Sequence, residues 1–108
     1  MNKTQNSVAM KVACYANSKN NKCSIDPATL LIIVNIIVNV IRLLYTCFFT
    51  EDAVAKNLKA PGRLQKFLLY REVKKNFPIS QRKAIYEGLL ATSKNLSDKE
   101  VKDLISSA

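Results

Sequence analysis

The sequence of residues 28–49, ATLLIIVNIIVNVIRLLYTCFF, is a nearly continuous apolar segment, and it decides the fold. Asp26 and Pro27, just before it, suit the N-cap and the first position of a helix. The pattern predicts one long helix over about residues 27–49, about 33 Å in length. Polar residues recur within it at spacings of four, three and four, which places them along one edge of the helix. This polar seam consists of Asn35, Asn39, Arg42 and Thr46.

Three interpretations of this apolar helix are open from the sequence. Its length suits a single membrane span, since the hydrocarbon core is about 30 Å thick, but Arg42 and two asparagines make the summed insertion free energy marginal. Alternatively, other subunits of an assembly bury the helix, and the amides of Asn35 and Asn39 specify its register. In the third interpretation, the chain is a small soluble bundle whose central helix turns the seam to water. We favour burial in an assembly, because short neighbouring helices offer little cover for so apolar a helix.

The rest of the sequence divides into two parts around this helix. Residues 1–24 form a polar amino-terminal arm, residues 25–50 hold the apolar anchor helix, and residues 51–108 form a basic helical tail. Apolar residues of the arm alternate with others in a pattern compatible with a short strand, and they are Val8, Met10, Val12 and Cys14.

The tail contains signals for three or four short amphipathic helices. Thr50 is a predicted cap for the first, and residues 61–62, Pro-Gly, end it. The second fits residues 63–76. The residues that we expect to face inward in this second helix are Leu64, Phe67, Leu68 and Val73.

Two further helices complete the tail. Ser80 is predicted to cap a helix over about residues 81–95. Ser97 and Glu100 have the spacing of a capping box, which begins a last helix that ends near Ser106. The predicted fold class is therefore mainly α, with one long apolar helix followed by short amphipathic ones.

The chain carries a formal charge of +9 at pH 7, and its cations are densest between residues 56 and 83. Glu72 is the one acidic residue in that block. Such a field favours a nucleic acid, an acidic protein surface or anionic lipid headgroups as partner, while a solvated face is the alternative. Tyr70 is the aromatic residue best placed in the block to stack on a base. The predicted contact residues are Lys56, Lys59, Arg63, Lys66, Arg71, Lys74, Lys75, Arg82 and Lys83.

Residues that carry catalysis or bind metals are scarce. The chain has no histidine and two glycines, so it lacks an imidazole base and a glycine-rich phosphate loop. Cys14, Cys23 and Cys47 fall short of a structural zinc site. We expect three ordinary thiols, with a Cys14–Cys23 bridge as the alternative. We therefore predict no catalytic residue, no metal, no cofactor and no small-molecule substrate.

The functional prediction is a non-catalytic structural subunit of a large assembly, bound to other protein subunits. A minor, capsid-associated virion protein anchored by its apolar helix is the favoured form, and this rests on analogy. One alternative is a single-pass membrane protein, either holin-like or an accessory subunit of a membrane complex. A basic nucleic-acid-binding module is the second alternative. The predicted location is the virion or a membrane, or the cytoplasm if the bundle is soluble.

Overall fold

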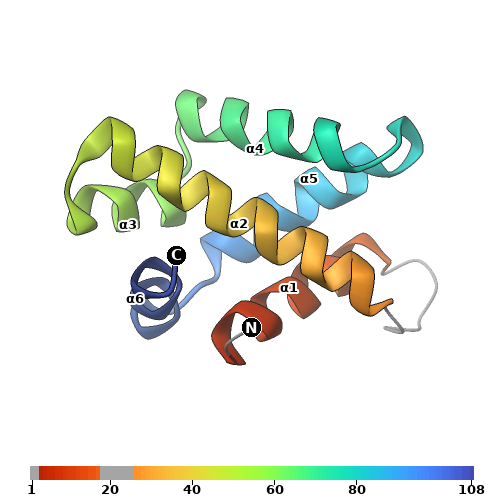
Figure 1. Ribbon diagram of the computed structural model, residues 1–108, viewed down its shortest axis with the longest axis horizontal. Helices are drawn as coiled ribbons and strands as arrows, with labels where there is room; N and C mark the ends of the chain where they lie inside the picture. The colour runs from red at the N-terminus through yellow and green to blue at the C-terminus, as the bar shows by residue number, and fades with distance from the viewer. Residues whose placement is uncertain (1–2, 18–25) are drawn as a thin grey trace.

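The computed structural model describes residues 3–17 and 26–108, which form six helices (Figure 1). The mainly α fold, with one long apolar helix near the amino terminus followed by shorter ones, is confirmed. The helices are α1 (Lys3–Ala16), α2 (Pro27–Phe48), α3 (Glu51–Lys59), α4 (Arg63–Asn76), α5 (Ile79–Lys94) and α6 (Asp98–Ser106).

Helix α1 corrects the expectation of a short strand in the amino-terminal arm. Val8, Ala9, Val12 and Ala13 are buried together, and their spacing of one, three and one places them on one helical face. The alternation seen in the sequence had skipped the two alanines of that face. Helix α1 packs most extensively against α5 and also against α2.

The crossing of α1 and α5 depends on Gly88. A Cβ atom at this position would lie 2.8 Å from the carbonyl oxygen of Val12, closer than real side chains approach. Gly88 therefore lets the two helix backbones approach closely, with Val12 and Tyr15 of α1 nearest to it.

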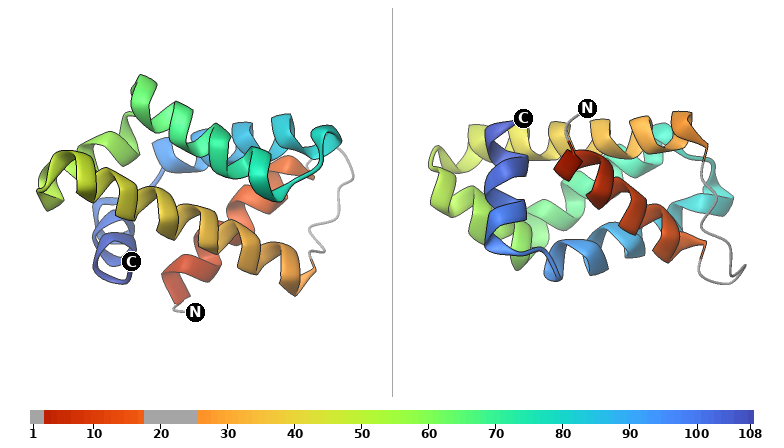
Figure 2. Two further views of the ribbon diagram at one scale, coloured as in Figure 1. Left: turned by 45° about the horizontal axis from the view of Figure 1, so that its top comes forward. Right: turned by 90° about the horizontal axis from the view of Figure 1, so that it is seen from below.

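Helix α2 begins and ends as its sequence predicts. The carboxylate of Asp26 accepts a hydrogen bond from the backbone N–H of Ala28 at 3.3 Å, and Pro27 is the first helical residue. After Phe48 the chain leaves the helix through Phe49, whose φ of 62° lies in the left-handed region. Helix α2 crosses the front of the molecule in Figure 1 and packs against α1, α3 and α4 (Figure 2).

The caps of the later helices agree with the sequence in two places out of three. The hydroxyl of Thr50 accepts from the N–H of Ala53 at 3.2 Å, and Ser97 and Glu100 form the predicted capping box. The cap at Ser80 is wrong, because α5 already begins at Ile79. Pro78 supplies the N-cap carbonyl there, which accepts from the N–H of Gln81.

Helix α6 is joined by ion pairs to two helices that pack on α2. The Lys11 ammonium lies 3.0 Å from the Glu100 carboxylate, and Lys59 lies 2.7 Å from Asp98. The backbone N–H of Ser97 and the Lys11 ammonium donate to Glu100 and lower its pKa. Lys59 lowers the pKa of Asp98 in the same way, through a hydrogen bond and its charge.

The cysteines differ from the expected three thiols. Cys14 is disulfide-bonded, whereas Cys47 is a free, exposed thiol on α2. Cys23, named in the alternative of a Cys14–Cys23 bridge, lies outside the described residues.

Candidate docking surface on helix α4

All four residues of the polar seam lie on the exposed side of α2. The hydroxyl of Thr46 donates to the backbone carbonyl of Arg42 at 3.1 Å, within the helix itself. The opposite side of α2 is buried against the chain's own helices. One of these is α1, a helix that the sequence did not predict. The buried residues of α2 are Ile33, Val34, Ile36, Ile37, Val40, Ile41 and Leu44.

Among the described residues, α2 is also the helix whose length and apolar composition suit a membrane span. The core helix of a soluble protein meets the same two criteria. Fewer than half of the residues in its most apolar window are buried within the chain.

The predicted block of cations is divided among three helices. Two members act within the chain, since Lys59 pairs with Asp98 and the guanidinium Nε of Arg82 donates to the carbonyl of Phe77 at 3.0 Å. Lys56 on α3 and Lys83 on α5 are exposed. The largest group lies on α4, where all five cations are exposed: Arg63, Lys66, Arg71, Lys74 and Lys75.

The face of α4 that is buried differs from the face that the sequence predicts. Leu68 and Val73 are buried as expected, but Leu64 is 42% exposed and Phe67 is 63% exposed, so the expectation that these two face inward is wrong. Their place is taken by Gln65, Leu69 and Glu72, which lie on the buried side. Apolar residues occur all around this helix, so their periodicity alone does not determine which face is buried.

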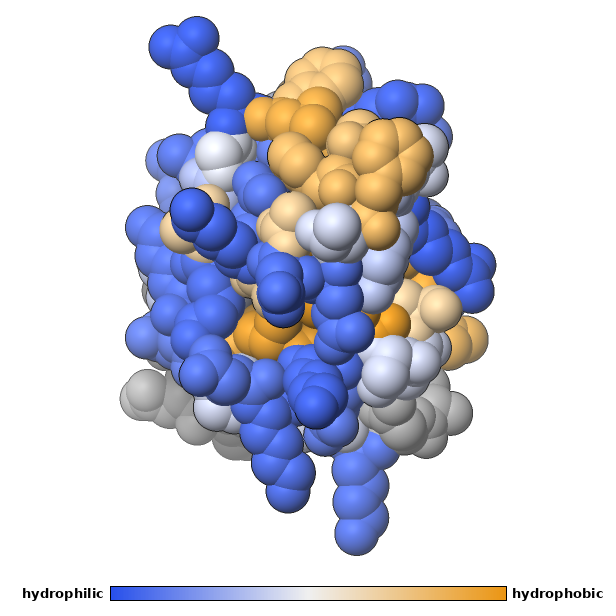
Figure 3. Space-filling view, turned by 90° about the vertical axis from the view of Figure 1, so that its left-hand side faces the viewer, coloured by the Kyte–Doolittle hydropathy of each residue, from blue (hydrophilic) through white to orange (hydrophobic). Residues whose placement is uncertain are grey.

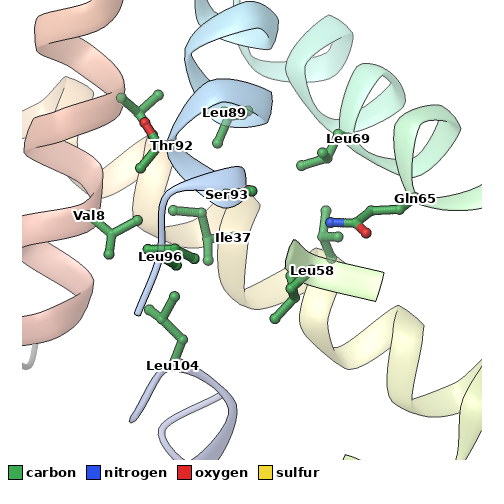
Figure 4. Close-up of a pocket in the computed structure, with 12 residues that line it drawn as sticks. Val8, Ile37, Leu58, Gln65, Leu69, Leu89, Thr92, Ser93, Leu96 and Leu104 are labelled. Atoms are coloured by element: carbon green, nitrogen blue, oxygen red, sulfur yellow. The ribbon is translucent and has the colours of Figure 1, made fainter. Parts of the chain in front are cut away.

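Gln65 is the least expected member of the core. Its side chain is 1% exposed, and neither its amide nitrogen nor its amide oxygen has a hydrogen-bond partner among the described residues. Figure 4 shows the amide reaching inward from α4, toward apolar side chains such as Leu58 and Leu69. A buried amide without partners lowers stability by about 1–3 kcal/mol.

The cavity beside Gln65 is small. Its volume is about 20 Å³, and side chains from all six helices line it, including Val8, Ile37, Leu89 and Leu104. That volume is enough for about one water molecule. The cavity is part of the core packing and is too small for a metabolite.

The outer face of α4 combines cations with exposed apolar and aromatic side chains. Arg63, Phe67, Tyr70 and Lys74 follow one another at spacings of four, three and four along the middle of this face. Glu72, the one acidic residue of α4, lies on the buried side. The face is therefore cationic and partly apolar, with no carboxylate from its own helix.

Tyr70, the predicted stacking residue, already has an aromatic neighbour. Its ring meets that of Tyr86 edge to face, with centroids 5.4 Å apart and planes at 90°. Phe67 is the most exposed aromatic side chain of α4.

Further apolar side chains are exposed at the end of the molecule where α2 finishes and α4 begins. Figure 3 faces this end and shows apolar side chains gathered in its upper part, among hydrophilic ones. The exposed large apolar residues in the last turns of α2, at its C-cap and in the first half of α4 are Leu43, Phe49, Leu64 and Phe67.

Residues 3–17 and 26–108 contain no group of three or more histidine, cysteine or acidic side chains placed to hold a metal ion. Comparison with protein-family models, with curated proteins and with solved structures gives no match.

Proposed function

We propose that this protein is a non-catalytic structural subunit of a larger assembly, and that it attaches to an anionic partner through the outer face of α4. The composition of that face carries the proposal. Five exposed cations lie on one helix of 14 residues, and the single carboxylate of the helix is on its other side. A face that carries one sign of charge attracts an oppositely charged partner over several ångströms.

The exposed apolar side chains favour this proposal over a merely solubilising face. Leu64 and Phe67 lie among the cations, although Leu68 and Leu69 beside them are buried. Apolar side chains that gather on a surface and are rimmed by polar ones are typical of interaction sites. A partner that covers α4 would remove both apolar side chains from water.

A minor, capsid-associated virion protein is the form of this subunit that we favour, since its small size and charge of +9 suit attachment to an anionic component of such an assembly. The single-pass alternative has less support. It requires α2 to separate from α1, α3 and α4, which would remove residues such as Ile33, Ile41 and Leu44 from the core.

Retention on immobilised heparin tests the proposed face, because heparin is a polyanion of no particular biological class. The test variant changes Arg71, Lys74 and Lys75 to Gln. The control changes Lys94, Lys99 and Lys102 to Gln, three exposed cations on α5 and α6. Both variants carry +6 in place of +9, three positive charges fewer.

We expect the α4 variant to elute at clearly lower salt than the control variant. The salt dependence of wild-type retention should also be steep, as it is when several cations bind together. Equal shifts for the two variants would mean that net charge alone governs retention, and the proposed face would be rejected.

A further inference from the structure

We infer that the anionic partner of α4 is the surface of a lipid bilayer, with Leu64 and Phe67 entering the headgroup region. This inference rests on the proposed function and names the class of partner. Helices that lie along a membrane surface combine Lys and Arg with Leu and Phe, so that cations contact phosphates while apolar side chains enter the boundary of the acyl chains. The outer face of α4 has both kinds of residue.

The position of α4 suits such contact. The helix lies along the outside of the molecule, at the top of Figure 1, and it packs mainly on α2 and α5. Its outer side is therefore open along its length. The exposed apolar residues occupy its amino-terminal half, and Arg71, Lys74 and Lys75 occupy its carboxyl-terminal half.

Phe49 is a second outward apolar side chain at the same end of the molecule. It occupies a left-handed conformation that glycine adopts more easily, and its side chain is 81% exposed. This bulky residue thus gains little from the chain's own packing. Insertion into a lipid surface would bury a side chain that the fold leaves in water.

The buried side of α4 supports the same inference. The amide of Gln65 lies in the core with no hydrogen-bond partner among residues 3–17 and 26–108, while Leu64, one residue earlier, is exposed. The orientation of α4 thus presents apolar side chains outward although a polar one is buried. A partner with an apolar layer would bury Leu64 and Phe67 and so remove the cost of exposing these two side chains to water.

Two other partners fit the face less well. A nucleic acid would use exposed aromatic rings for stacking, and Phe67 offers one such ring. However, the ring of Tyr70 is engaged with Tyr86, and the aliphatic Leu64 cannot stack. A second copy of this chain would bring the same five cations to the contact, and like charges repel. An anionic bilayer uses both the cations and the apolar side chains.

Co-sedimentation with lipid vesicles tests the inference. The vesicles contain phosphatidylcholine alone or with phosphatidylglycerol, over a salt series. We compare wild type with the double variant Leu64→Ser, Phe67→Ser and with the α4 glutamine variant. The controls are Leu31→Ser, which removes a leucine that is 48% exposed on α2, and the glutamine variant of Lys94, Lys99 and Lys102.

We expect wild type to sediment with the anionic vesicles and not with neutral ones. Affinity should fall at least about tenfold in the double serine variant and at least about tenfold in the α4 glutamine variant. Both controls should stay within about twofold of wild type. Equal binding by the double serine variant would overturn insertion of these side chains.

A parallel titration of labelled single-stranded and duplex DNA separates this inference from the proposed function. DNA binding with no binding to anionic vesicles, together with α4-dependent heparin retention, would overturn the bilayer as partner and leave the docking face intact. Heparin retention that is insensitive to the α4 substitutions would overturn the docking face itself.

Discussion

Helices α2 and α4 pack against each other, yet they distribute polar and apolar residues in opposite ways. Helix α2 turns its asparagines and Arg42 to solvent and its isoleucines and valines to the core. Helix α4 buries Gln65 and Glu72 while Leu64 and Phe67 are exposed. The chain's own packing thus accounts for most of the pattern of α2, although Leu31 and Leu43 are exposed. By contrast, the exposure of Leu64 and Phe67 beside a buried Gln65 is what the proposed partner of α4 would account for.

The largest expected contrast is between a buried residue of α2 and an exposed one of α4. Leu44→Ala should lower the free energy of unfolding by about 2–5 kcal/mol, because Leu44 is fully buried and its loss leaves a cavity. Phe67→Ala should change it by less than about 0.5 kcal/mol. Urea unfolding followed by circular dichroism measures both. A comparable loss for Phe67→Ala would show that the fold itself uses this side chain.

Substitution of Gly88 tests the close crossing of α1 and α5. Gly88→Ala should lower the free energy of unfolding by about 1–3 kcal/mol, because the added methyl group would meet the Val12 carbonyl oxygen. Helix propensity alone predicts the opposite sign, a gain of about 1 kcal/mol. Gly62→Ala is the control, since, apart from its neighbours in the chain, no atom of the described residues lies within 4 Å of its Cβ position, and its effect should stay below about 1 kcal/mol. A stabilising Gly88→Ala change would contradict the close crossing of α1 and α5.

Gln65 tests the buried side of α4. Gln65→Leu should raise the free energy of unfolding by about 1 kcal/mol, because it replaces an amide that has no partner in the described part of the chain with an apolar group of similar size. Gln81→Leu on the exposed side of α5 should have almost no effect. If Gln65→Leu lowered stability, the amide would have partners, and the disadvantage that we assign to this orientation of α4 would be removed.

The dependence of stability on pH tests the ion pairs that join α6 to α1 and α3. Hydrogen bonds and Lys11 lower the pKa of Glu100 in the folded state, and Lys59 lowers that of Asp98. Their contribution is therefore complete above the unfolded-state values, about 4, and is lost as pH falls through the folded-state values. Unfolding measured from pH 7 to pH 3 should show this fall, and Glu100→Gln should make it shallower. An unchanged acid profile would mean that the Glu100 contacts do not persist in solution.

The smallest expected effect belongs to the polar seam of α2. Asn39→Leu should change the free energy of unfolding by less than about 0.5 kcal/mol, because Asn39 is exposed. The isolated protein should also keep its oligomeric state in analytical ultracentrifugation. A shift to a different oligomer would support the interpretation in which the seam specifies the register of a neighbouring subunit.

Local sequence signals predicted most of the helices. Asp26-Pro27, Thr50 and the Ser97–Glu100 box mark helix starts through short-range chemistry, and the structure has all three. Helix α1 was missed because its buried face is made partly of Ala9 and Ala13, which carry little apolar signal in the sequence.

Local sequence signals do not predict which residues of α4 are buried. Its leucines and aromatics surround the whole helix, so the choice of Leu69 over Phe67 as a core residue depends on the shape that α2 and α5 present. The seam of α2 was found from its spacing, but its exposure depends on which side α1, α3 and α4 cover. The cations of the block were identified from sequence, while their division among three helices required the fold.

The absence of tryptophan from the chain allows a direct test of the central claim, that the outward side chains of α4 serve a lipid contact. Phe67→Trp places a single indole on the proposed surface, and Tyr15→Trp places one on α1 as a control. The account predicts that anionic vesicles shift the emission of the Phe67→Trp protein to shorter wavelength and that lipid-borne quenchers reduce it, with no change for the control. Emission from Phe67→Trp that is unchanged by the vesicles would contradict the account.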